Sequence, residues 1–150
     1  MAQGDVTVFD QFRENIGEKI VNLETDTINV GLITNAVTPA ASTADPCWGA
    51  GGTTNFSTNE VTPGGNYSAG GSAIANPVYS QTGGVATFDG DNVAIAAHAS
   101  NPTTARWGII YSDTATNKNC IAYVDLGGVT DLTSGGLTLA WNASGIFTLT

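Results

Sequence analysis

Residues 7–34, TVFDQFRENIGEKIVNLETDTINVGLIT, change their hydrophobic period halfway along. In the first half, large apolar residues recur at spacings of three and four, which predicts an amphipathic helix from Thr7 to Val21. Its apolar stripe consists of Phe9, Phe12, Ile16 and Ile20. From Thr27 onward apolar residues alternate with others, which predicts a β-strand with one buried face. A short helix is therefore expected to precede a body built from strands.

Short apolar runs separated by turn residues follow in the second half of the chain. The expected strands are 67–75, 78–81, 85–88, 93–97, 105–111, 120–126, 137–141 and 146–149. Turn signals such as Gly83-Gly84 and Asp89–Asn92 lie between them. Eight or nine short strands at such a spacing are typical of a sandwich or barrel and not of alternating β and α units. We predict a mainly β fold, a jelly-roll-like antiparallel β-sandwich with one short N-terminal α-helix.

The chain is expected to divide into an N-terminal helical arm, residues 1–22, and a β-sandwich body, residues 23–150. Residues 35–63 of the body contain three prolines and a Gly-Ala-Gly-Gly run without sustained alternation, which predicts a long loop. Loops of this length are usually functional or mobile. Trp48 and Phe56 are large apolar residues in that loop, so we expect them to pack against a neighbouring subunit or back onto the body.

Charge is scarce and unbalanced. Charged residues make up 11% of the 150 residues, and 13 acidic against 4 basic side chains give a formal net charge of −9. Phosphate neutralisation dominates nucleic-acid binding, so we expect no direct binding to nucleic acid or to a membrane. Cys47 and Cys120 are too few for a disulfide-rich secreted module, and we expect two reduced thiols. Neither a signal peptide nor an apolar run of ~20 residues is present, which favours synthesis and retention in the cytoplasm.

Candidate catalytic and metal-binding residues are few. His98 is the only histidine, and because no nucleophile pattern accompanies it, we expect a partly exposed residue at a loop edge. Asp89–Asn92 and the turn after Asp113 offer oxygen ligands, but the remainder of a calcium-binding loop is missing. Small polar residues of this kind are typical of turns. The sequence therefore predicts no catalytic residue, no metal and no cofactor, and a protein that is not an enzyme.

Five stretches of the chain occur in an order found in one family of virion proteins. They are GEKIVNLETDTINVGLIT (17–34), GGNYSAGGSAI (64–74), ARWGIIYSDTAT (105–116), NCIAYVDLGG (119–128) and LAWNASGIFTLT (139–150). In these stretches the chain resembles the small decoration, or cement, proteins that bind the outside of assembled tailed-bacteriophage capsids. The resemblance implies a β-sandwich without enzymatic activity, seated as a homotrimer on the major capsid protein. It also implies a place on the capsid surface of the virion after synthesis in the host bacterial cytoplasm.

Aromatic anchors contribute disproportionately to interface energy, so the large apolar residues of the helix and loop are the expected interface residues. They are Phe9, Phe12, Ile16, Trp48 and Phe56. The helix is either a docking element between subunits or a plug for one end of its own sandwich, and its stripe does not distinguish these. Two other functions stay open: a tail- or fibre-associated structural protein, and a carbohydrate-binding β-sandwich that uses Trp48 or Trp107 as a stacking platform.

Overall fold

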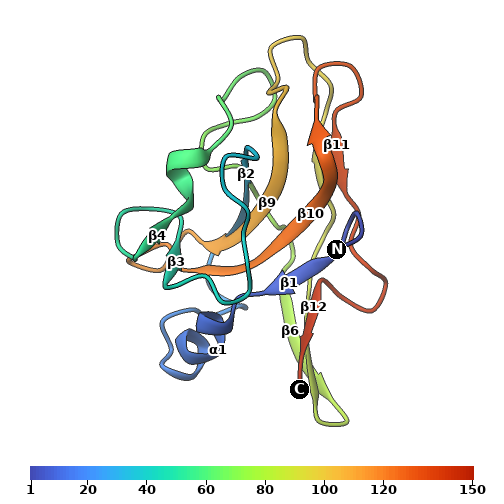
Figure 1. Cartoon of the computed structure of the whole chain (residues 1–150). Helices are drawn as coiled ribbons and strands as arrows, with labels where there is room; N and C mark the ends of the chain where they lie inside the picture. Colours follow the sequence, from blue (N-terminus) through green and yellow to red (C-terminus); the bar gives the residue numbers. More distant parts are fainter.

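The computed structural model describes all residues, 1–150, and confirms the predicted fold class. Strands hold 39% of the residues and helices 8%, so the chain is mainly β, with a sandwich-like arrangement of antiparallel sheets (Figure 1). The elements are β1 Val6–Val8, α1 Asp10–Gly17, β2 Ile28–Ile33, β3 Pro46–Cys47, β4 Thr54–Asn55, η1 Phe56–Asn59, β5 Ser72–Ala73, β6 Val78–Thr82, β7 Val85–Asp89, β8 Val93–Ile95, β9 Ala105–Ser112, β10 Cys120–Thr130, β11 Leu137–Leu139 and β12 Phe147–Leu149.

A five-stranded antiparallel sheet with the order β1-β10-β9-β2-β5 forms the centre of the molecule. Its longest pairings join β9 to β10 and β2 to β9, with Gly31 opposite Ile109 and Val124 opposite Gly108. The smaller sheets, β12-β7-β6 and β11-β8, lie against one face of this central sheet. Strands that are far apart in the sequence are neighbours in this central sheet, so the sheet holds the two halves of the chain together.

Both faces of the central sheet are buried, which corrects the expectation that β2 has one exposed face. Successive residues of β9 alternate between two apolar clusters, with Ile110 in one and Ile109 and Tyr111 in the other. The inner cluster, which includes Val30, lies between the central sheet and the smaller sheets. The outer cluster lies on the opposite face and comprises Phe9, Ile33, Trp48, Phe56, Trp107, Ile109, Tyr111, Cys120 and Tyr123. The sheet is therefore the middle layer of three.

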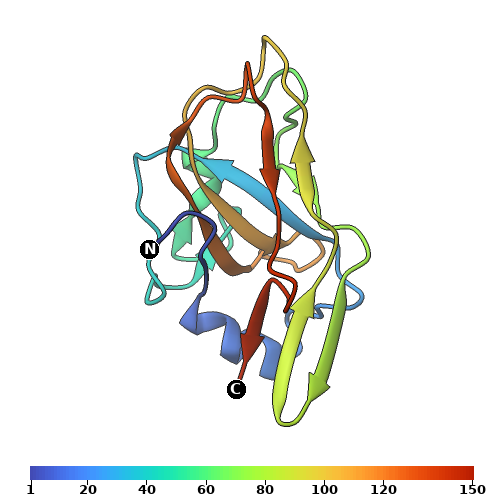
Figure 2. The same cartoon turned by 90° about the vertical axis from the view of Figure 1, so that its right-hand side faces the viewer.

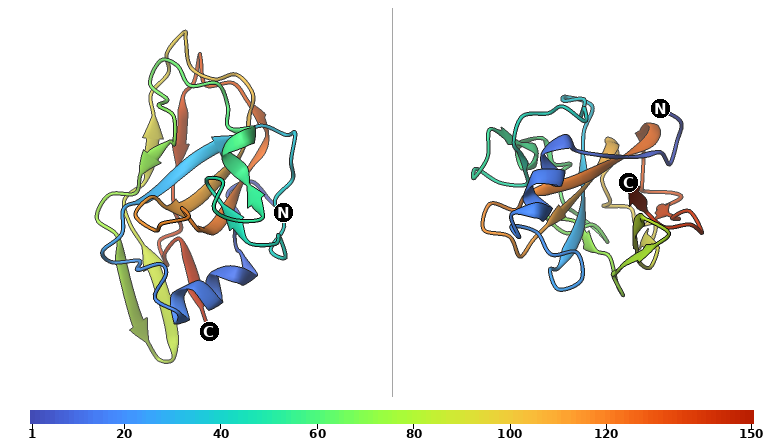
Figure 3. Two further views of the ribbon diagram at one scale, coloured as in Figure 1. Left: turned by 90° about the vertical axis from the view of Figure 1, so that its left-hand side faces the viewer. Right: turned by 90° about the horizontal axis from the view of Figure 1, so that it is seen from below.

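Residues 35–63 form the third layer, an ordered cover over the outer face of the central sheet. The segment contains the two-stranded parallel pair β3-β4 and the 3-10 helix η1 (Figure 3, left view). Trp48 stacks on Tyr111 with 5.0 Å between ring centroids and 8° between ring planes. Phe56 packs against Phe9 at 5.8 Å. Of the two places expected for these loop aromatics, the structure shows packing back onto the body.

The N-terminal helix is shorter than predicted and follows a strand of the central sheet. Val6–Val8 pairs with β10, and Phe9 continues this pairing because its amide donates to the carbonyl of Ile121 at 3.0 Å. The helix ends at Gly17, and Lys19 takes the left-handed conformation with φ +61°, which turns the chain away. Residues 6–9 are therefore part of the central sheet, and the helical segment that follows begins from this strand.

The predicted strand 67–75 is reduced to Ser72–Ala73 by two consecutive glycines. Gly70 and Gly71 have φ values of +84° and +81°, a conformation that ordinary side chains rarely adopt and that interrupts a strand. A Cβ on Gly71 would also collide with the backbone of Val30, so this segment passes directly over the edge of β2. The other expected strands from 78 onward are present, with shifts of a few residues at their ends.

Candidate binding surface

Four of the five residues predicted as interface anchors are buried in the chain's own core, so that prediction is wrong for them. The exposed fraction is 0% for Phe9, Phe12 and Phe56 and 5% for Trp48. Phe12 meets the ring of Phe147 edge-on in the inner cluster, whereas the other three belong to the outer cluster. Ile16 is partly buried against the inner cluster. Phe9, Phe12 and Ile16 of the stripe therefore cover their own sandwich, which is the plug arrangement considered above. Ile20 lies beyond the end of α1 and is 41% exposed.

Trp48 and Trp107 do not form an exposed platform for sugar stacking, which corrects the residue assignment of the carbohydrate hypothesis. Trp48 has one ring face against Tyr111. Trp107 is 7% exposed, meets Tyr123 edge-on, and is covered by the Arg106 guanidinium at 3.8 Å from its ring centroid. The same guanidinium forms an ion pair with Asp125 on the neighbouring strand. These groups hold β9 to β10.

The titratable residues considered for chemistry are used in local turns. His98 is exposed, and its Nδ1 accepts a hydrogen bond from the amide of Ser100 at 3.1 Å. In the 89–92 turn, Asp89 accepts from the amide of Gly90, and Asp91 accepts from the Asn76 carboxamide. No group of three or more His, Cys, Asp or Glu side chains is close enough to hold a metal ion. Each of these side chains therefore has a hydrogen-bond partner within the chain.

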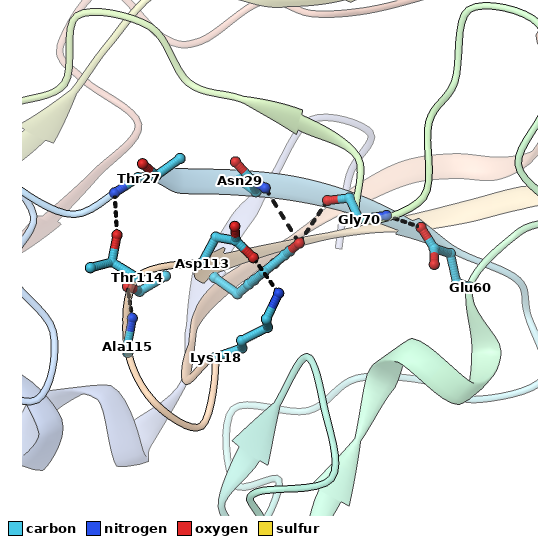
Figure 4. Close-up of polar contacts among 10 residues, drawn as sticks. Thr27, Asn29, Glu60, Gly70, Asp113, Thr114, Ala115 and Lys118 are labelled. Atoms are coloured by element: carbon cyan, nitrogen blue, oxygen red, sulfur yellow. Dashed lines mark hydrogen bonds and ion pairs between the residues drawn. The ribbon is translucent and has the colours of Figure 1, made fainter.

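A partly buried polar network that the sequence did not suggest fastens residues 60–71 to the central sheet, and Figure 4 shows its contact between Glu60 and Gly70. Glu60 accepts hydrogen bonds from the Tyr67 hydroxyl at 2.8 Å and from the Gly70 amide at 2.6 Å. The Tyr111 hydroxyl donates to the carbonyl of Gly70 at 2.7 Å, and the Tyr67 hydroxyl accepts from the amide of Leu32 at 2.9 Å. The local sequence pattern does not reveal this network, because its members come from three segments that are far apart in the chain.

Burial keeps both tyrosines of the network protonated. Removal from water raises the pKa of Tyr111 to about 12 and raises the pKa of Tyr67 further, with the nearby Glu60 carboxylate acting in the same direction. Both hydroxyls therefore stay protonated, and able to donate, well above neutral pH. A protonated hydroxyl that donates to a carbonyl or a carboxylate stabilises the folded chain. The network is accordingly a structural clamp.

The two cysteines are free and buried. Burial raises the pKa of the Cys47 thiol to about 11, and burial also raises the pKa of Cys120 well above its ordinary value. The thiolate is the reactive form of cysteine, so both side chains are held in the inert form.

The β6–β7 hairpin is the element that projects furthest from the layered body (Figures 1 and 2). Its two strands are joined by Gly83-Gly84, both with positive φ, as a two-residue hairpin turn requires. Strand β6 pairs only with β7, so its second edge is unpaired. The edge strands of the central sheet, β1 and β5, contain three and two residues, whereas β6, an edge strand of the β12-β7-β6 sheet, contains five.

The β6–β7 hairpin carries one charge, Asp89 at the end of β7 opposite Val78, and is otherwise uncharged on a strongly acidic chain. Residues 78–88 include no Asp, Glu, Lys, Arg or His, although the whole chain carries −9. Val78 is 53% exposed, and residues 80–82 are exposed as well. Exposed edge strands are usually protected by charges, proline or a bulge, none of which interrupts β6. We regard this unprotected edge as the candidate binding surface.

No family model, no curated protein and no solved structure matches the chain. None of its helices is long and apolar enough to cross a membrane.

Proposed function

We propose that this protein is a structural virion protein that binds the outside of an assembled bacteriophage capsid and stabilises the shell. The resemblance of five stretches to capsid decoration proteins supports the proposal, and so does a body whose central sheet is packed on both faces. The observation that carries it is the open, uncharged edge of β6 on a projecting hairpin. A site that binds another protein is expected to be exposed, unpaired and uncharged in this way.

The edge of β6 provides affinity through backbone groups. An exposed strand can add to the sheet of another protein, and the main-chain hydrogen bonds then supply affinity without charged side chains. Many copies of a chain with a net charge of −9 repel one another on a crowded surface, so contacts through the uncharged strand β6 avoid part of that cost.

Binding only to the assembled lattice stabilises the lattice by mass action. In this proposal the partner is the major capsid protein, and the chain acts as a homotrimer whose three copies bind three equivalent surfaces together. Such a trimer gains avidity even when each contact is weak. Weak single contacts suit a short edge of five residues.

The proposal is tested by binding to emptied capsids of the parent phage, with bound protein measured by co-sedimentation. Val78→Lys/Ser80→Lys places two charges on the β6 edge, and Thr103→Lys/Thr104→Lys places the same charges in the exposed loop before β9, at the opposite end of the molecule (Figure 1). We expect the hairpin variant to bind about tenfold more weakly or worse and the control to bind as wild type. Equal binding by both variants, or a particle map that places the chain in the tail, contradicts the proposal.

A further inference from the structure

The free edge of β6 presents a defined set of backbone groups. Residues 83–84 close the hairpin with positive φ, so Thr82 and Val85 form the hydrogen-bonded pair that flanks the turn. Hydrogen-bonded and non-hydrogen-bonded pairs alternate along an antiparallel ladder, so Tyr79 and Gln81 direct their N–H and C=O groups away from β7. No second strand pairs with this edge, and no other backbone group of the chain bonds to it. Two amides and two carbonyls are therefore unpaired.

This set of backbone groups is complementary to itself. When Ser80 lies opposite Ser80 of a second, antiparallel copy, Tyr79 of each chain lies opposite Gln81 of the other chain. Each of these pairs exchanges two hydrogen bonds, so every unpaired group is used. The neighbouring registers are poorer, because one places Pro77, which has no N–H, opposite Gln81, and the other places Gly83 of the turn opposite Tyr79. Hydrogen bonding therefore selects one register.

Charge and position also favour a second copy of the chain at this edge. Two chains with a net charge of −9 repel each other, but β6 carries no charge, and Asp89 of the hairpin lies on β7, the strand further from the second copy. A charged partner strand would be desolvated without gaining an ion pair, whereas another β6 has no charge to desolvate. The hairpin extends away from the layered body with β6 as its outer strand, so the body leaves this edge open (Figure 2).

The exposed side chains of β6 fit the same register. Val78 is 53% exposed, and it lies opposite Thr82 of the second copy when the two Ser80 residues face each other. Pairs of β-branched residues across neighbouring strands stabilise a sheet. The contact also removes from water an apolar side chain that the single chain leaves exposed.

We propose that the free protein forms a twofold dimer, in which two β6 strands pair antiparallel with Ser80 at the axis. The two β12-β7-β6 sheets then form one continuous sheet, and both unprotected edges are covered. A contact of five residues a side is far smaller than the roughly 20–30 residues a side of a stable interface, so the dimer is reversible. Capsid binding uses the same edge, so dimer and capsid compete for it. That competition rests on the proposed function, whereas the dimer itself does not.

Cysteine cross-linking tests the register. In the dimer the two Ser80 residues form a non-hydrogen-bonded pair, with Cα atoms about 4.5 Å apart, which a disulfide spans. Ser80→Cys should therefore form a covalent dimer in oxidised glutathione at least about tenfold faster than Thr82→Cys, because the two Thr82 residues lie four positions apart along the ladder, about 13 Å. Cys47 and Cys120 are buried and do not interfere. Equal rates for the two variants contradict the register.

Sedimentation equilibrium of the free protein, from about 10 μM to about 1 mM, tests the dimer itself. Gln81→Pro removes an outward-facing amide from each chain and leaves the ladder to β7 intact, so it should weaken the dimer about tenfold or more. Thr104→Pro is the matched control, an exposed loop position whose amide makes no hydrogen bond, and it should dimerise as wild type.

A wild-type chain that stays monomeric throughout this range, or a Gln81→Pro variant that dimerises as well as wild type, overturns the dimer. These measurements contain no capsid, so they are independent of the co-sedimentation result. A dimer found with a chain that does not bind capsids removes the proposed function alone, and a monomer that binds capsids removes the dimer alone.

Discussion

Replacement of Gly31 by alanine tests how residues 35–63 are held on the central sheet. Gly31 lies in β2 beneath the indole of Trp48, and a Cβ built on it would lie under 3.0 Å from three atoms of that ring. The indole has no room to retreat, because its other neighbours include the Tyr111 ring, stacked at 5.0 Å. Overpacking of this kind costs about 1–3 kcal/mol of unfolding free energy. The alanine variant should therefore be destabilised although glycine itself is unfavourable in a strand.

The sign of this effect should reverse once the indole is removed. Trp48→Ala alone is expected to cost about 3–5 kcal/mol, since the side chain is buried. In that background Gly31→Ala meets no ring and should stabilise the chain by about 0.5–1 kcal/mol, because alanine loses less backbone entropy in a strand. The coupling energy between the two positions is then about 1.5–4 kcal/mol, well above the deviation expected of independent sites.

Urea unfolding followed by far-ultraviolet circular dichroism measures the four proteins of this cycle without relying on tryptophan fluorescence. Gly128→Ala is the matched control, because a Cβ at that glycine of β10 would have no atom within 4 Å. The control should be neutral or slightly stabilising. A cost for Gly31→Ala that is the same, within about 0.5 kcal/mol, in the presence and absence of Trp48 refutes the packing described for this layer.

Three further outcomes follow from the polar and titratable groups. The hydrogen bond from Arg106 holds the pKa of Asp125 below its ordinary value, so the stabilisation by Asp125 is complete above pH ~4 and is lost as the pH falls through the folded-state pKa. In acid titrations of stability, Arg106→Gln should weaken this dependence without abolishing it, because the amide of Gly127 also donates to Asp125. Cys47 and Cys120 should react with iodoacetamide at pH 8 only on unfolding, and rapid alkylation of the native chain would contradict their burial. Tyr67→Phe should lower the unfolding free energy by about 1–3 kcal/mol in urea titrations, because a buried amide of β2 and a carboxylate lose their partner; an unchanged midpoint would be inconsistent with the clamp.

Local patterns in the sequence were sufficient to predict most of the strands. The evidence for these strands comes from residues that are neighbours in the chain. It includes the alternation in 28–33 and 105–111 and the Gly83-Gly84 turn between two apolar runs. The helix was found because its period differs from that of a strand. The predicted start of the helix was three residues too early, because Val6–Val8 forms a strand that pairs with β10. The local sequence pattern cannot reveal a pairing between residues more than 110 positions apart.

The residues of the candidate surface were misassigned for a related reason. An apolar stripe shows that Phe9 and Phe12 need a partner, but it contains nothing that distinguishes a neighbouring subunit from the chain's own core. The uncharged residues 78–88 were visible in the sequence as composition only. Their importance depends on the sheet order, which leaves β6 without a second neighbour.

The sequence by itself determined the mainly β class, the position of one short helix and the scarcity of charge, because each of these depends on residue type and on spacing along the chain. Only the tertiary structure decided that both faces of the central sheet are covered, that the expected anchors are core residues, and that the outer edge of β6 lacks a partner in the chain. Burial and hydrogen bonding are properties of what surrounds a side chain in space, and those surroundings are assembled from segments that local periodicity does not connect.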